Sequence, residues 1–182
     1  MAIRKIFNSE QEVLSKVCKP IKGINMRMKI LAEDLADTVI AAEGVGLAAP
    51  QVGVMKRMFV TRPNLEVPEE IFTYINPEII SEEGEQLCTE GCLSVPGYMG
   101  IVKRPKKIRI KYQDLEGGWH EDEYEDFNAD IICHEYDHLQ GIIYTSRADR
   151  IMTEEEYVEA MAAIGDGDDL EEIISKKEKG GK

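Results

Sequence analysis

The stretch from Cys133 to Leu139 contains the pattern H-E-x-x-H, and it constrains this chain more than any other segment. Residues four apart lie on one face of an α-helix, about 6 Å apart along its axis, so His134 and His138 can bind one metal ion from the same side. Glu135 lies beside them, where its carboxylate can reach a water on that metal. The pattern therefore predicts a helix, a metal site and a third ligand supplied from elsewhere.

Composition limits the class of protein in which this helix lies. The chain has 182 residues, of which 43% are hydrophobic, and this is enough for one soluble domain with a normal core. The formal net charge of −13 argues against a specific nucleic-acid partner, which would need a basic face. The apolar runs are too short to cross a membrane, so we expect no membrane association.

The ends of the chain and its cysteines suggest a compartment and a domain boundary. The N-terminal residues lack an apolar signal region, so we expect a cytoplasmic, bacterial protein with reduced cysteines. We expect a single catalytic domain over residues 1–164. Residues 165–182 are rich in acidic residues and end in lysines, which predicts a flexible tail.

Periodicity and turn residues outline the secondary structure. Apolar residues at intervals of three and four from Ile24, with Asn25 as N-cap and Gly44 as stop, indicate an amphipathic helix. Asn76-Pro77 is expected to separate two strands as a turn, and opposite charges on facing arms support a hairpin. The patterns predict helices over 24–42, 127–140 and 153–164, and strands over 57–61, 71–75, 78–87, 107–112 and 119–124.

Several residues compete to be the third metal ligand. Cys92 is favoured because it lies in a stretch of small residues, and thiolate is a good ligand for zinc and ferrous iron. His120 is the only other histidine. A protease-like site would instead use a downstream glutamate, and a closed structural site would add Cys88 to Cys92 and the two histidines. The candidate glutamates are Glu154, Glu155, Glu156 and Glu159.

Three motifs stand together in one order: G-V-G-L-A-A-P-Q at 44–51, E-G-C-L-S at 90–94 and H-E-Y-D-H at 134–138. This combination closely resembles the peptide deformylases, and the resemblance spans roughly residues 20–150. It implies an α+β fold in which antiparallel strands pack around a central helix that carries the third motif. An N-terminal helix and a C-terminal helix complete that fold.

The resemblance also implies an activity and a set of catalytic residues. Peptide deformylases are metal-dependent hydrolases that remove the formyl group from the N-terminal formyl-methionine of newly made polypeptides and release formate. They use Fe2+ in the cell, and Zn2+, Ni2+ or Co2+ can replace it. Carried onto this chain, the metal ligands are Cys92, His134 and His138, the general acid/base is Glu135, and the oxyanion donors are the Gln51 amide and the Leu93 backbone N–H.

Substrate contacts follow from the same resemblance. Gly46 would pair its backbone with that of the nascent peptide, and Glu90 is placed with the substrate-binding residues. The methionine side chain needs an apolar pocket, for which we expect Val45, Cys88, Phe127 and Ile131. Many relatives have an arginine shortly after the cysteine motif, where this chain has the uncharged residues 97–100, so the partner that neutralises Glu90 is not apparent. Some relatives contact the ribosome transiently through a C-terminal helix, whereas the acidic tail here favours a solubilising role.

Overall fold

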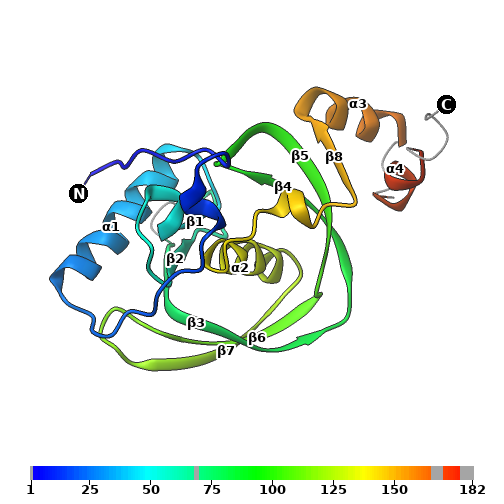
Figure 1. The fold of residues 1–182 in the computed structure, drawn as a ribbon. Coiled ribbons are helices and arrows are strands. Elements are labelled where there is room, and N and C mark those ends of the chain that lie inside the picture. Colours follow the sequence, from blue (N-terminus) through cyan, green and yellow to red (C-terminus); the bar gives the residue numbers. More distant parts are fainter. Residues whose placement is uncertain (1, 68–69, 165–169, 177–182) are drawn as a thin grey trace.

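Helix α2 (Asp126–Leu139) runs through the middle of the molecule, and the strands wrap around it (Figure 1). The computed structural model describes residues 2–67, 70–164 and 170–176. The fold is α+β with antiparallel strands around a central helix, as the sequence predicted. Within the described part of the chain, no helix is long and apolar enough to cross a membrane.

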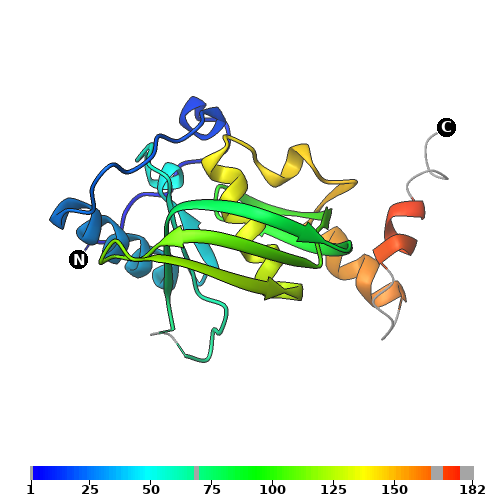
Figure 2. The ribbon, with the colours of Figure 1, turned by 90° about the horizontal axis from the view of Figure 1, so that it is seen from below.

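The strands form two antiparallel sheets. The larger has the order β1-β2-β3-β6-β7 and the smaller the order β4-β5-β8. Figure 2 shows the larger sheet passing across α2. The strands are β1 (Gly46–Ala48), β2 (Met58–Thr61), β3 (Phe72–Glu83), β4 (Gln86–Cys92), β5 (Val95–Arg104), β6 (Lys107–Gln113), β7 (Trp119–Glu125) and β8 (Arg150–Thr153).

Asn76 and Pro77 do not form the predicted turn. They lie inside the continuous strand β3, where the register with β6 shifts between Ile75 and Glu78. Pro77 has no N–H to donate, and Asn76 has a positive φ of 50°, so the pair forms an irregularity of the strand instead. The Asn76 side chain also bonds the backbone N–H and C=O of Ile21, each at 2.8 Å. The chain reverses later, near Gly84.

The predicted hairpin is confirmed as β6 and β7. Lys107 faces Glu125 and Arg109 faces Glu123 across the two strands. The Lys107 ammonium lies 2.8 Å from the Glu123 carboxylate. Opposite charges therefore support the register at the surface, as the alternation in the sequence suggested.

The other helices pack against the outside of the strands. They are α1 (Met26–Ala41), α3 (Glu154–Ile164) and α4 (Leu170–Lys176), with the 3-10 turns η1 (Glu12–Ser15), η2 (Ala49–Val52) and η3 (Tyr144–Ser146). Asn25 caps α1 by accepting a hydrogen bond from the backbone N–H of Met28. Thr153 and Glu156 form a capping box at the start of α3, with reciprocal bonds of 2.8 and 3.1 Å.

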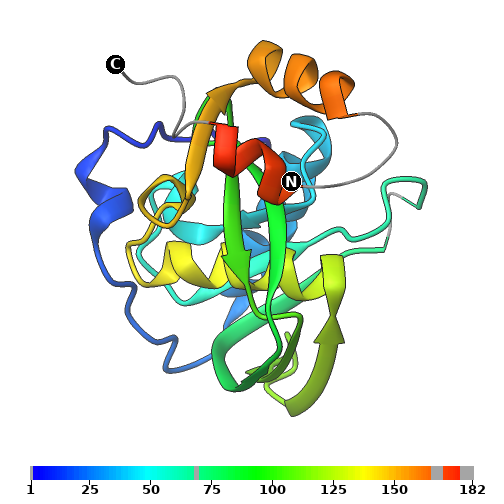
Figure 3. The same ribbon diagram turned by 90° about the vertical axis from the view of Figure 1, so that its right-hand side faces the viewer.

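The predicted tail contains a described helix. Leu170, Ile173 and Ile174 of α4 lie at helical spacing and pack with Ile101 and Met152, beside β5, β8 and α3 (Figure 3). A short apolar stripe in an acidic segment was enough to form this contact, and the sequence interpretation overlooked it. The other positions of the predicted tail, 165–169 and 177–182, lie outside the described residues.

Helix α2 is buried on two chemically different sides. Ala129, Ile132 and Cys133 pack with the apolar side chains of the larger sheet. His134 and His138 face the opposite way, toward the smaller sheet and the end of β4. Gly141 follows the C-cap of the helix, and its φ of 73° belongs to the left-handed region that favours glycine. A Cβ at this position would also lie 2.6 Å from the backbone of Ser15.

We predict that Gly141→Ala destabilises the fold by more than the ~1–2 kcal/mol of left-handed strain alone, because the added methyl group also meets Ser15. Gly117→Ala is the matched control, since Gly117 has a φ of 87° but its nearest contact would be 3.9 Å away. Thermal unfolding of both variants measures the difference. Equal losses of stability would show that the close approach to Ser15 carries no cost.

Candidate active site

Three groups that can bind a metal meet where β4 ends beside the middle of α2. The Cys92 sulfur and ring nitrogens of His134 and His138 all lie within 4.8 Å of one another. Cys92 Sγ is 3.3 Å from His138 Nε2. In tetrahedral zinc sites, metal–ligand bonds of about 2.0–2.3 Å place neighbouring ligand atoms about 3.5 Å apart. The spacing and the donor set therefore fit one metal ion.

A buried oxygen of Glu135 points to the same conclusion. Glu135 lies between the two histidines of α2, and its Oε2 atom has no hydrogen-bond partner among the described residues. A buried carboxylate oxygen normally needs a donor, and a water at the three ligands would supply one. Burial raises the pKa of Glu135 to about 7, so this group can both accept and donate a proton near neutral pH.

Glu90 fixes the orientation of His134. Its Oε2 atom lies 2.6 Å from His134 Nδ1. Burial acts to raise the pKa of Glu90, but hydrogen bonds from His134 and Arg104 outweigh it and lower the pKa to about 2. An ionised Glu90 can only accept, so Nδ1 carries the proton and Nε2 keeps the lone pair that a metal requires.

Arg104 is the neutralising partner of Glu90, and the sequence interpretation missed it. Its Nε and Nη2 atoms donate to the two oxygens of Glu90 at 2.6 and 3.0 Å. Arg104 is the last residue of β5, and its side chain is only 4% exposed. Tyr144 was also missed, and its ring stacks on His134 at 6.0 Å. Neither residue belongs to a local motif that would have revealed its role.

Gln51 is held with its donor group toward the cysteine. Its Oε1 accepts the backbone N–H of Ala48 at 2.8 Å, which leaves Nε2 facing Ser94 Oγ at 3.2 Å and Cys92 Sγ at 3.5 Å. The amide N–H groups therefore point into the site. Leu93 follows the cysteine and lines the same cleft.

Gly46 lies against Glu135. A Cβ on Gly46 would be 2.4 Å from the Oε1 atom of Glu135, which is itself buried. We expected a small residue here so that the substrate backbone could approach. The geometry adds a second reason, since any side chain would displace the Glu135 carboxylate.

An open cleft of about 420 Å³ leads to these groups. Val45, Phe127 and Ile131 line it, and Phe127 is 55% exposed at its mouth. Asp130 also lines the cleft, so the cleft wall is less apolar than the sequence suggested. Cys88 is not among the cleft-lining residues of the described chain; it is buried, and burial followed by the nearby Asp130 raises the pKa of its thiol.

The competing ligands lie elsewhere in the described structure. His120 is on the hairpin, where its Nε2 atom is 2.6 Å from Asp114. Glu154 lines the cleft but is not part of the three-residue cluster. The other candidate glutamates of α3 belong neither to the cleft lining nor to the cluster among the described residues. Cys88 is not in the cluster either, so the described residues contain no closed Cys2His2 site.

A helix that brings two imidazoles and a carboxylate to a thiol in an open cleft defines the class of metal-dependent hydrolases. A sequence profile of the polypeptide deformylases matches residues 3–154. The peptide deformylase of Thermoanaerobacter pseudethanolicus is 48% identical over 156 residues, which cover 86% of this chain and 96% of that protein. The chain belongs to the polypeptide deformylase family.

Solved structures agree with this assignment. The crystal structure of the Thermotoga maritima peptide deformylase has a TM-score of 0.78 and 34% identity, covering 81% of this chain and 99% of that one. The Met-Ala-Ser-bound class I type b enzyme of Acinetobacter baumannii has a TM-score of 0.75 and 32% identity, covering 80% and 98%. The chain is thus a metal-dependent enzyme that removes the N-terminal formyl group from nascent peptides.

We predict that Cys92→Ala purifies with almost no metal, because two imidazoles alone make a weak site. Cys88→Ala is the matched control and should retain close to one metal ion per chain. Elemental analysis of both proteins, purified anaerobically, makes the comparison. A Cys92→Ala protein that keeps its metal would mean that another group completes the site.

Proposed function

We propose that Cys92, His134 and His138 hold one divalent ion, ferrous iron in the cell, and that deformylation takes place beside it. The observation that carries the proposal is the cluster of these three ligands at a cleft that Glu135 also lines. A thiolate with two imidazoles suits both iron and zinc, so zinc, nickel or cobalt can occupy the same ligands. When bound, the ion supplies a Lewis acid and lowers the pKa of a water.

Glu135 acts as the general acid/base. Its buried carboxylate takes a proton from the attacking water, and the same carboxyl group later delivers a proton to the leaving amine. The pKa of about 7 suits both steps. Gly46 keeps the space beside Glu135 free, so the carboxylate can stay at the attacking water.

Gln51 and Leu93 stabilise the oxyanion that forms on the formyl oxygen. The Gln51 amide is already oriented, because Ala48 occupies its oxygen and leaves its nitrogen as the donor toward the site. The Leu93 backbone N–H, next to the cysteine ligand, is the second donor. Removing one donor of this kind typically costs on the order of 10²–10³-fold in turnover.

The nascent peptide binds as an added strand. Among the described residues, β1 is an edge strand of the larger sheet and pairs only with β2, so Gly46 can offer its free backbone side to an extended peptide. The formyl-methionine side chain lies against Val45, Phe127 and Ile131 in the cleft. The Met-Ala-Ser-bound relative supports this, since that peptide begins with the methionine that deformylation leaves behind.

The bacterial origin of the relatives supports a bacterial cytoplasmic location, where formylated chains emerge from the ribosome. A direct contact with ribosomal RNA receives no support from the described C-terminal segment. Its helix α3 begins with Glu154, Glu155 and Glu156, and acidic side chains repel phosphate.

Formate release from a formyl-Met-Ala peptide tests the function directly. We predict that iron-loaded wild-type protein releases formate and that Glu135→Gln loses at least ~10²-fold in turnover while keeping its fold and metal, because the amide cannot accept the proton. Turnover near the wild-type rate in Glu135→Gln would refute its role. If the wild-type protein released no formate, the proposed function itself would fail.

Gly46→Ala should also lose most of its turnover, since the methyl group pushes the Glu135 carboxylate away from the site. Metal content should not change, because the three atoms nearest to the added methyl group all belong to Glu135, which is not one of the three ligands. Gly23→Ala serves as control, as a Cβ there meets nothing within 4 Å. Wild-type turnover in Gly46→Ala would show that Glu135 does not depend on this close approach.

A further inference from the structure

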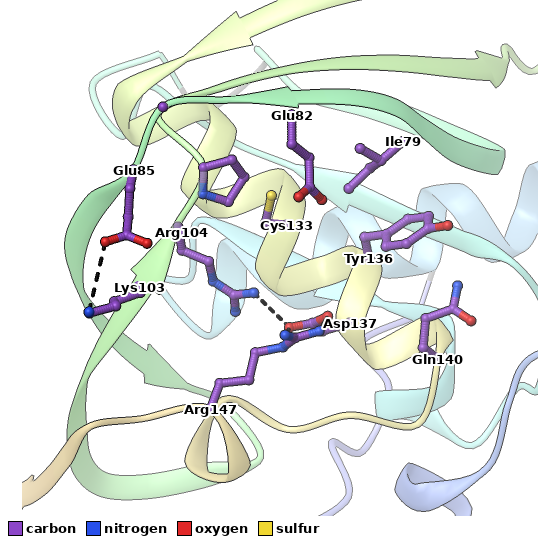
Figure 4. A pocket seen from close by; sticks show the side chains of 12 residues that line it. Ile79, Glu82, Glu85, Lys103, Arg104, Cys133, Tyr136, Asp137, Gln140 and Arg147 are labelled. Carbon is purple, nitrogen blue, oxygen red and sulfur yellow. Dashed lines mark hydrogen bonds and ion pairs between the residues drawn. The ribbon is translucent and has the colours of Figure 1, made fainter.

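A second hollow lies on another side of α2, away from the cleft. It has a volume of about 450 Å³ and is lined on the helix by Cys133, Tyr136, Asp137 and Gln140, none of which lines the cleft. Figure 4 shows Arg104 and Arg147 reaching Asp137 in this groove from two different segments. We call it the rear groove.

Four charged side chains connect the rear groove to the metal site. Arg147 follows η3 and donates to Asp137 from Nε at 2.6 Å and Nη2 at 2.8 Å. Asp137 Oδ2 also accepts from Arg104 Nη1 at 2.7 Å. Arg104 donates through its other two nitrogens to Glu90, which accepts from His134 Nδ1. The contacts form an unbroken series from the protein surface to a metal-site histidine.

Because most of this series is buried, the loss of any of its ion pairs would leave a charged group without a partner and away from water. Arg104, Glu90 and Asp137 are almost completely buried, whereas the Arg147 side chain is 44% exposed. A buried carboxylate that loses its partner pays the full desolvation cost, so Glu90 cannot keep its position without Arg104. Arg104 and Glu90 form a two-point contact, which fixes the carboxylate plane as well as its position.

One oxygen of Glu90 is bonded by both Arg104 and His134, so the position of the arginine affects the orientation of this histidine. Its Oε2 atom accepts from both Arg104 Nη2 and His134 Nδ1, at 3.0 and 2.6 Å. A rotation of the Arg104 guanidinium would therefore move the oxygen that orients the imidazole. Asp137 opposes such a rotation from the other side of the guanidinium, and Arg147 holds Asp137.

We propose that Arg104 is a positioning residue for His134, and that Asp137 and Arg147 in the rear groove hold Arg104 in place. The inference rests on the proposed function in one respect, since it takes His134 to be a metal ligand. It assigns the rear groove a part in the reaction although its α2 residues do not line the cleft. The orientation of a metal ligand is set partly by an exposed arginine on another side of the helix.

The rate at which the metal-loaded protein loses its ion to a chelator measures the effect. Partners that orient a ligand typically contribute 10- to 100-fold to metal affinity, so Arg104→Gln should lose its metal about 10- to 100-fold faster than wild type. Arg147→Met should lose it several-fold faster, and Arg147→Lys should recover part of that loss. Lys103→Met is the matched control, because Lys103 lines the same groove but pairs with Glu85 instead.

Three further readouts separate positioning from a structural role. The absorption spectrum of the cobalt-loaded protein should change in Arg104→Gln and Arg147→Met, since it reports the ligand geometry. Turnover number should fall with little change in KM, because neither arginine lines the cleft. Guanidinium at non-denaturing concentration should slow metal loss from Arg104→Ala, as the rear groove gives it access to the vacated position.

Arg147 is exposed, so its variants fold even if those of Arg104 do not. Wild-type metal loss and an unchanged cobalt spectrum in Arg147→Met would overturn the role of the rear groove. If Arg104→Gln lowered only the unfolding temperature of the metal-free protein, Arg104 would be structural. Failure of the proposed function would appear separately, as a wild-type protein that releases no formate.

Discussion

The burial of a polar helix is the constraint on which the rest of this structure depends. Helix α2 takes five acidic or histidine side chains out of water, and each must find a partner there or remain costly. The five are Asp130, His134, Glu135, Asp137 and His138. Three contacts accompany that burial. They are the ion pairs of Arg104, the thiol of Cys92 beside His138, and the close packing of Gly46 against Glu135.

The two sheets contact different sides of α2 and stabilise its burial in different ways. The larger sheet packs with the apolar side of α2 and so fixes the helix in place. The smaller sheet supplies polar partners from two adjacent strands, namely Glu90 and Cys92 from β4 and Arg104 from β5. Because β4 and β5 are paired directly, Glu90, Cys92 and Arg104 all lie on one pair of hydrogen-bonded strands. Positioning on strands in this way gives a site the rigidity that catalysis needs.

The sequence predicted the features that local spacing encodes. Helices α1, α2 and α3, the Asn25 cap and the charged hairpin follow from the sequence pattern, and the three motifs predicted that Cys92, His134 and His138 lie together. Local spacing does not encode contacts between segments that are far apart in the sequence. Arg104 meets Glu90 across 14 residues and Asp137 across 33, so no periodicity could identify it as a buried partner. The irregular strand at Asn76 was missed for the same reason, because its side chain bonds a residue 55 positions away.

The central claim is that one thiolate and two imidazoles form the metal site at the middle of α2. X-ray absorption spectroscopy of the anaerobically purified, metal-loaded protein tests it most directly. If the bound ion is zinc, we predict one sulfur ligand at about 2.3 Å and two imidazole nitrogens at about 2.0–2.1 Å, with the remaining ligand an oxygen. With iron the distances will differ, but one sulfur and two imidazoles are still expected. A spectrum without sulfur, or with two sulfur ligands, would contradict the account.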